Sequence, residues 1–197
     1  MATGGKVYQL LSCPFDAMGS AMATYCGQNV GAGKLDRLPQ GIYACSLLGL
    51  VYSVGAFASM LFLAPQSVML FLSSAEPQLD VLLPLTTQYI ITFTAFFFPL
   101  ALVNILRFSI QGMGFSALAI FAGVLEMIAR TVVGRFFVPA AGYTAACFAS
   151  PAAWICADLF LILACLGCVA RLKRNPVGSL ETLSRGVEQG PVKAAKM

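Results

Sequence analysis

Five long apolar runs dominate this chain of 197 residues and leave few alternatives for its fold. A helix that crosses a bilayer needs about 20 mainly apolar residues, and each run meets that length or comes close. The expected membrane-spanning segments are residues 7–27, 41–63, 82–108, 115–138 and 144–169. We therefore predict an all-α, polytopic transmembrane helix bundle over residues 1–174, followed by a disordered cytoplasmic tail at residues 175–197.

Composition excludes several other classes of protein. Only 10% of the residues are charged, whereas a soluble domain has about 25%. No histidine is present, so the chain lacks the usual general base and the commonest metal ligand. The net charge of +4 is small and indicates membrane topology rather than nucleic-acid binding. We expect membrane lipids as partners, no metal and no cofactor.

The charged connectors predict an orientation. Alternating spans place Lys34, Arg37, Arg107 and the basic run at 171–174 on one side of the membrane, and the acidic connector at 73–80 on the other. Cytoplasmic loops are enriched in Lys and Arg. We therefore expect a multi-pass protein of the cell (plasma) membrane with a cytoplasmic C-terminus.

The seven cysteines lie mostly inside apolar runs, where cysteine behaves as a small hydrophobic residue. Cys165 and Cys168 have the CxxC spacing, but no second pair and no histidine accompany them. Helix packing is the favoured interpretation, with a redox or metal role as the alternative.

Charges inside the spans are expensive to insert into lipid. Glu126 and Arg130 lie one helical turn apart in the fourth span and are predicted to pair, either as a fixed structural contact or in a water-filled path where they exchange partners. Asp16 and Asp158 lie near the middle of the first and fifth spans. Both are expected to face protein, and each is either protonated, paired across the bundle or exposed to an aqueous cavity. A position in a cavity is one of two equal choices for Asp16, and it is disfavoured for Asp158, whose small neighbours suggest tight helix packing. Arg107 lies near a span end, where it can extend to the interface.

The third span combines aromatic and polar residues, among them Tyr89 and Asn104. Such a mixture suits a pocket for a greasy organic cation, and hydrogen bonding between helices is the alternative. Pro99 lies closest to the middle of a span and predicts a bend, with either a purely structural or a gating role.

A glycine-rich segment between the first two spans looks at first like a phosphate-binding loop. Its spacing fails the test, since Gln28 stands where a glycine is needed and Leu35 where Ser or Thr is needed. We interpret the segment as a helix exit at the membrane face. Its residues are Gly27, Gln28, Asn29, Gly31, Gly33, Lys34 and Arg37.

Three stretches in order resemble motifs of the MATE (multidrug and toxin extrusion) transporters. They are residues 21–37, 107–114 and 123–130, and Ala153-Trp154 also fits. The resemblance implies helices eight to twelve of a twelve-helix, two-lobed protein, so that the chain would be part of the C-terminal lobe. In the family's pattern Arg107, Glu126 and Arg130 match motif positions with a structural or coupling-relay role. No family coupling acid can be carried onto this chain.

The resemblance implies multidrug efflux: antiport of cationic or amphipathic organic compounds against sodium ions or protons, with the coupling ion left open. A partner chain or the missing N-terminal lobe would complete the site. The alternative is a non-transporting membrane fragment or interaction protein. A membrane enzyme is disfavoured because the parts of a hydrolytic site are lacking.

Overall fold

The computed structural model describes residues 2–71 and 79–174 and contains helices without strands in those ranges. The helices are α1 (Ala2–Gly31), α2 (Arg37–Phe71), α3 (Leu79–Ala95), α4 (Phe97–Gly112), α5 (Ser116–Val132), the π-helix η1 (Val133–Phe137) and α6 (Val138–Arg174). The all-α prediction is confirmed. The predicted tail at 175–197 and most of the acidic connector lie outside the described residues.

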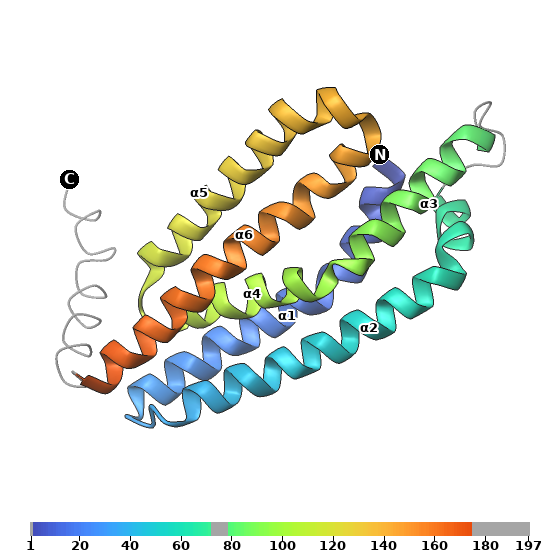
Figure 1. The fold of residues 1–197 in the computed structure, drawn as a ribbon. Coiled ribbons are helices and arrows are strands. Elements are labelled where there is room, and N and C mark those ends of the chain that lie inside the picture. The colour runs from blue at the N-terminus through green and yellow to red at the C-terminus, as the bar shows by residue number, and fades with distance from the viewer. Residues whose placement is uncertain (1, 72–78, 175–197) are drawn as a thin grey trace, which may run out of the picture.

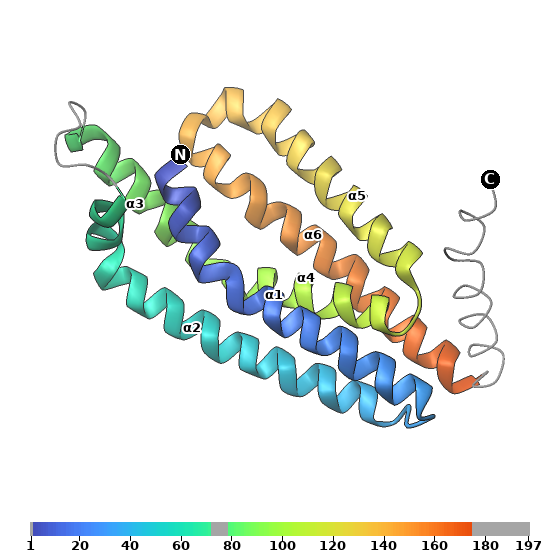
Figure 2. The same cartoon turned by 180° about the vertical axis from the view of Figure 1, so that it is seen from behind.

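The helices run back and forth along a common direction, as Figures 1 and 2 show. Helices α5 and α6 lie along one edge of the bundle and α1 and α2 along the other. Helix α4 lies between them and packs against all four. The α1–α2 loop, the α4–α5 turn and the end of α6 gather at one end, and the N-terminus and the start of α3 lie at the other (Figure 1).

Within the described residues, three helices are long enough and apolar enough to cross a membrane. These segments are Arg37–Ala64, Ser116–Phe137 and Ala146–Arg174, and the bent pair α3–α4 makes a fourth if it is counted as one span. Helix α1 has 30 residues, which is long enough, but it is too polar to be selected. The fold is therefore that of a multi-pass helical membrane protein, and the first of the five predicted spans stays a prediction.

The predicted third span is two helices that meet at an angle of 50°. Helix α3 ends at Ala95 and α4 begins at Phe97. Proline has no N–H to donate, and its ring clashes with the carbonyl four residues earlier. Counted back from Pro99, that carbonyl belongs to Ala95, so the break falls where the proline predicts a bend.

The connection from α5 to α6 also contains a break. Gly142 has φ 62° and ψ −138°, outside the helical region, in the short uncharged connector that the sequence predicts between the last two spans. Residues with a side chain rarely adopt positive φ. The long straight part of α6 therefore begins after Gly142.

The buried core lies between the helices and is rich in aromatic residues. Phe15, Phe97 and Trp154 are among its largest fully buried side chains. The outer faces of α2 and α5 are apolar but exposed, with Phe62, Phe121 and Met127 each more than half exposed. A soluble monomer rarely shows such large apolar surfaces, whereas a bilayer is a suitable solvent for them.

Helices α1 and α4 approach each other closely through small residues. A Cβ atom on Gly112 would collide with the backbone of Ala23, and one on Gly19 would lie 2.6 Å from the ring of Phe108. Small residues permit this kind of backbone contact between membrane helices. This packing fixes the position of α1 against the centre of the bundle.

Candidate functional site

Glu126 on α5 is the centre of a group of ion pairs. Its Oε2 accepts a hydrogen bond from Nη2 of Arg107 on α4 at 2.6 Å, and its Oε1 accepts one from Arg130 one turn further along α5. The side chain of Glu126 is 12% exposed, that of Arg107 24% and that of Arg130 47%. The predicted Glu126–Arg130 pair is confirmed. Arg107, expected to extend to the interface, instead turns inward to bind Glu126, because a buried carboxylate is a better partner than the membrane surface.

A second acid lies close to this group. Asp158 on α6 is 7% exposed, and the charges of Glu126 and Arg107 both act on it. Oδ1 of Asp158 and Nε of Arg107 are buried and have no hydrogen-bond partner among the described residues. Arg107, Glu126, Arg130 and Asp158 thus form a cluster, called here the ion cluster, where α4, α5 and α6 meet.

Aromatic side chains from three helices lie beside the ion cluster. The ring of Tyr8 on α1 stacks on Trp154 of α6 with centroids 6.3 Å apart, and Phe93 of α3 packs edge-on against both Tyr8 and Trp154. Tyr89 packs on Phe93 at 4.2 Å. Trp154 lies one helical turn before Asp158 on α6, so the aromatic group adjoins the ion cluster. The sequence indicates Tyr89 as a candidate of the substrate pathway and Trp154 only through the family resemblance.

The exposed face of α1 is polar. Gln9, Asp16, Ser20, Thr24 and Gln28 recur at intervals of seven or four residues and are all exposed. Residues at such spacing share one helix face, and we call this face the polar stripe. The hydroxyls of Ser20 and Thr24 donate to carbonyls one turn earlier in the same helix. Asp16 is exposed and makes no ion pair with the described residues.

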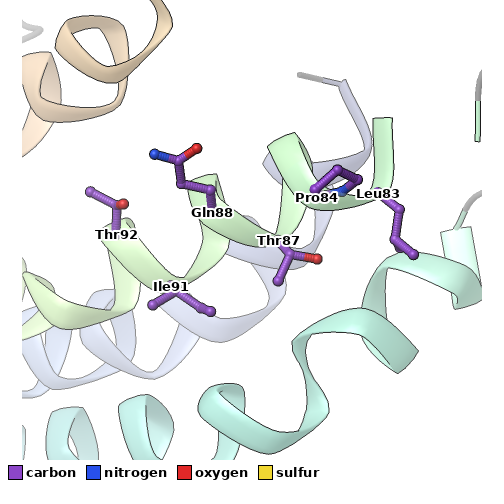
Figure 3. Close-up of a pocket in the computed structure, with 6 residues that line it drawn as sticks. All are labelled: Leu83, Pro84, Thr87, Gln88, Ile91 and Thr92. Atoms are coloured by element: carbon purple, nitrogen blue, oxygen red, sulfur yellow. The ribbon is translucent and has the colours of Figure 1, made fainter. Parts of the chain in front are cut away.

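The polar residues of the third predicted span do not converge on one enclosed pocket. A pocket of about 550 Å³ is lined only by side chains of α3, and it is therefore an open groove beside one helix. In Figure 3, Gln88 and Thr92 point away from one side of α3, and Thr87 and Ile91 point from the other. Thr94 donates to carbonyls of its own helix, and Asn104 is partly buried on α4.

The glycine-rich segment at the end of α1 is a helix stop. Gly33 has φ 69°, its N–H donates to the carbonyl of Val30, and the N–H of Lys34 donates to that of Asn29. These two bonds define the Schellman ending of a helix. The N–H groups of Gly33 and Lys34 are used in these bonds, so they are not free to bind a phosphate. The side chain of Asn29 donates to the carbonyl of Tyr25 within the helix, and backbone N–H groups satisfy the carbonyls of Gln28, Asn29 and Val30 at its end.

The stretch around Gln111 ends α4 in the same way. Gly114 has φ 91°, its N–H donates to the carbonyl of Gln111, and the N–H of Phe115 donates to that of Ile110. Two of the motifs found in the sequence are therefore helix ends built alike, at the same end of the bundle. Arg37, from the first motif, is exposed, and its carbonyl accepts a bond from the Tyr25 hydroxyl.

The cysteines form no recognisable metal site. Cys165 and Cys168 are both buried free thiols. Within the described ranges, no group of three or more Cys, Asp or Glu residues is arranged to hold a metal ion. Burial of both thiols agrees with the packing interpretation.

The fold and the exposed apolar faces define a multi-pass helical membrane protein. The family model MatE matches residues 1–136 of the chain, and the chain therefore belongs to the MatE family, whose members are transporters rather than enzymes. The match contains Arg107, Glu126 and Arg130 but ends before the long straight part of α6, so it does not include Ala153-Trp154. No curated protein matches the chain, and no solved structure matches it.

Proposed function

We propose that this chain forms part of a secondary transporter that exports cationic or amphipathic organic compounds in exchange for sodium ions or protons. The observation that carries the proposal is the polar stripe of α1. The outer faces of α2 and α5 are largely apolar, whereas the exposed face of α1 is polar and has a carboxylate near its middle. Ionisable groups at membrane depth mark substrate or ion paths, and a carboxylate attracts a cation.

The stripe is proposed to face an aqueous cavity rather than lipid. Exposed polar side chains in contact with hydrocarbon would lose their hydrogen bonds to water, which is costly. Further helices, in a second lobe or a partner chain, are proposed to form the opposite wall. In this arrangement the chain corresponds to the C-terminal lobe, with the α6 end in the cytoplasm.

Native cysteines provide a direct test of the aqueous cavity. Cys13 on α1 is exposed beside the polar stripe, and Cys156 on α6 is exposed on a face shared with Leu159 and Leu163. A water-soluble maleimide is expected to label Cys13 and leave Cys156 unlabelled in lipid vesicles. Labelling of Cys156 as fast as Cys13, or of neither, would contradict a hydrated stripe.

Transport is tested in vesicles with an imposed sodium or proton gradient and a fluorescent organic cation. The full chain is reconstituted alone and together with a chain that supplies the proposed second lobe. Asp16→Asn is expected to abolish gradient-driven dye movement, whereas Asp36→Asn, which removes a carboxylate outside the stripe, is expected to retain it. Equal activity of both variants would remove Asp16 from the path. Full coupled export by the chain alone would show that no second lobe is needed.

A further inference from the structure

Two buried polar atoms in the ion cluster lack hydrogen-bond partners among the described residues, and they are complementary. Nε of Arg107 is a donor on α4, and Oδ1 of Asp158 is an acceptor on α6. The two helices pack directly on each other, and the charge of Arg107 acts on Asp158. Buried polar groups are nearly always paired, so a pair of this kind calls for a physical explanation.

The distribution of charge in the ion cluster explains why these two atoms are unpaired. Glu126 is bound by two cations, Arg107 and Arg130, whereas no cation in the described part of the chain binds Asp158. An isolated charge at a buried position is strongly disfavoured, and Glu126 repels a second negative charge placed near it. Asp158 therefore needs either a bound proton or a cation of its own.

The neighbouring elements offer few cations. Among the residues whose side chains the structure describes, the charged or titratable groups on elements packed against α6 are Arg107 on α4, Glu126 and Arg130 on α5, Arg135 in η1, Tyr89 on α3 and Tyr8 on α1, which stacks on Trp154. On α6 itself, Cys156 and Cys165 are the nearest titratable residues in sequence. Of the charged groups, only Glu126 and Arg107 act appreciably on Asp158. Arg107 is the one cation placed to serve both acids.

We propose that Asp158 is a proton-binding site whose occupancy decides which carboxylate Arg107 binds. In the arrangement described here, Asp158 holds the proton and Arg107 binds Glu126. When the O–H bond of Asp158 breaks, the proton leaves to water and Arg107 donates to the new carboxylate instead. Glu126 keeps Arg130, so neither acid is left charged and unpaired in either state.

This exchange would change a contact between helices. Arg107 ties α4 to α5 when it binds Glu126, and it would tie α4 to α6 when it binds Asp158. Proton binding is a property of this bundle and is independent of what the chain transports. Use of the exchange to drive export would rest on the proposed function.

Infrared difference spectra of the full chain in lipid vesicles, recorded between neutral and alkaline pH, test the site. The wild-type chain is expected to show the carbonyl stretch of a protonated carboxyl group at neutral pH, and Asp158→Asn is expected to lose it. Glu126→Gln is also expected to lose the band at neutral pH, because Arg107 is then free to bind the Asp158 carboxylate. Asp36→Asn, which alters an exposed acid in the α1–α2 loop outside the cluster, is expected to keep it.

The outcomes separate the two parts of the proposal. A wild-type chain without the band would overturn proton binding, and a Glu126→Gln chain that keeps the wild-type band would overturn the exchange. If Asp158→Asn does not fold, labelling of the wild-type chain with a hydrophobic carbodiimide followed by mass spectrometry assigns the proton. Asp158 is then expected to be modified and ion-paired Glu126 to be unmodified, and the reverse pattern would refute the assignment. None of these readouts depends on transport.

Discussion

Lys173, near the end of α6, donates a hydrogen bond to Asp36 in the loop between α1 and α2, with Nζ 2.7 Å from Oδ1. The two residues are 137 positions apart in the chain. At the same end of the bundle, the guanidinium of Arg171 lies 5.8 Å from the centre of the Phe115 ring. The end of α6 therefore contacts both the α1–α2 loop and the α4–α5 turn, the first through an exposed ion pair and the second through a cation–π contact.

The Lys173 pair predicts a dependence of stability on pH. The hydrogen bond and charge of Lys173 hold the pKa of Asp36 below its ordinary value of 3.8. A lowered folded-state pKa means that the pair stabilises the fold above the unfolded-state pKa, and that this contribution is lost as the pH falls through the folded-state pKa. Asp36→Asn should therefore be slightly less stable than the wild type at neutral pH and equally stable in strong acid. Denaturant titration at both pH values measures this, and a difference that persists in acid would exclude the pair as its source.

Arg107 and Arg130 bind the same carboxylate but should differ in their contribution to stability. Breaking a buried ion pair typically costs about 3–5 kcal/mol, while an exposed pair contributes about 0–1 kcal/mol. Arg107 is 24% exposed and Arg130 is 47% exposed. The Arg107 pair is partly buried and lies between these two cases, so Arg107→Ala should lower the free energy of unfolding by about 2 kcal/mol. The Arg130 pair is exposed, so Arg130→Ala should lower it by less than about 1 kcal/mol. Equal losses, measured by unfolding in mixed detergent, would show that exposure does not set the strength of these pairs.

Gly33 is predicted to be required for its backbone conformation. Its φ of 69° is unfavourable for residues with a side chain, although no atom lies within 4 Å of a Cβ placed there. Gly33→Ala should therefore destabilise the fold by about 1–2 kcal/mol through backbone strain alone. Gly31→Ala is the control, since that position also has free space but no positive φ. If the two variants unfold alike, the Schellman ending of α1 contributes nothing to stability.

Gly112 is predicted to be required for a different reason, namely the space it leaves. A Cβ atom there would collide with the backbone of Ala23, so Gly112→Ala should push α1 and α4 apart and cost about 1–3 kcal/mol. Gly27→Ala, whose Cβ would make an ordinary 3.5 Å contact with the Gly112 carbonyl, should leave stability unchanged or raise it slightly. Disulfide trapping between cysteines introduced in α1 and α4 reports the spacing. Unchanged trapping in Gly112→Ala would contradict close packing.

Features encoded within one helix could be predicted from the sequence. The apolar runs predicted the helices, and Pro99 predicted the bend. The four-residue spacing of Glu126 and Arg130 predicted their ion pair. The interpretation of the segment around Gly33 as a helix exit was also confirmed, by the two backbone hydrogen bonds that end α1 there.

Features that depend on contacts between helices were missed. The inward turn of Arg107 depends on where α5 packs against α4, and no spacing along the chain reveals it. Asp158 was recognised as an acid in mid-span but not chosen as a site residue, since its nearness to Arg107 depends on the packing of α6. The family match includes Arg107 and Glu126 but ends before Asp158, so that comparison could not add it.

Helix α1 is the long described helix that is not apolar enough to be counted as a membrane span, yet it packs against α4 at the centre of the bundle. Its outward row of amide, hydroxyl and carboxyl groups gains nothing from hydrocarbon. What keeps α1 at that depth is therefore its neighbours, above all the glycine-mediated contact with α4. During synthesis, α1 would be expected to settle only after α4 has been made, although α1 leaves the ribosome before the other described helices.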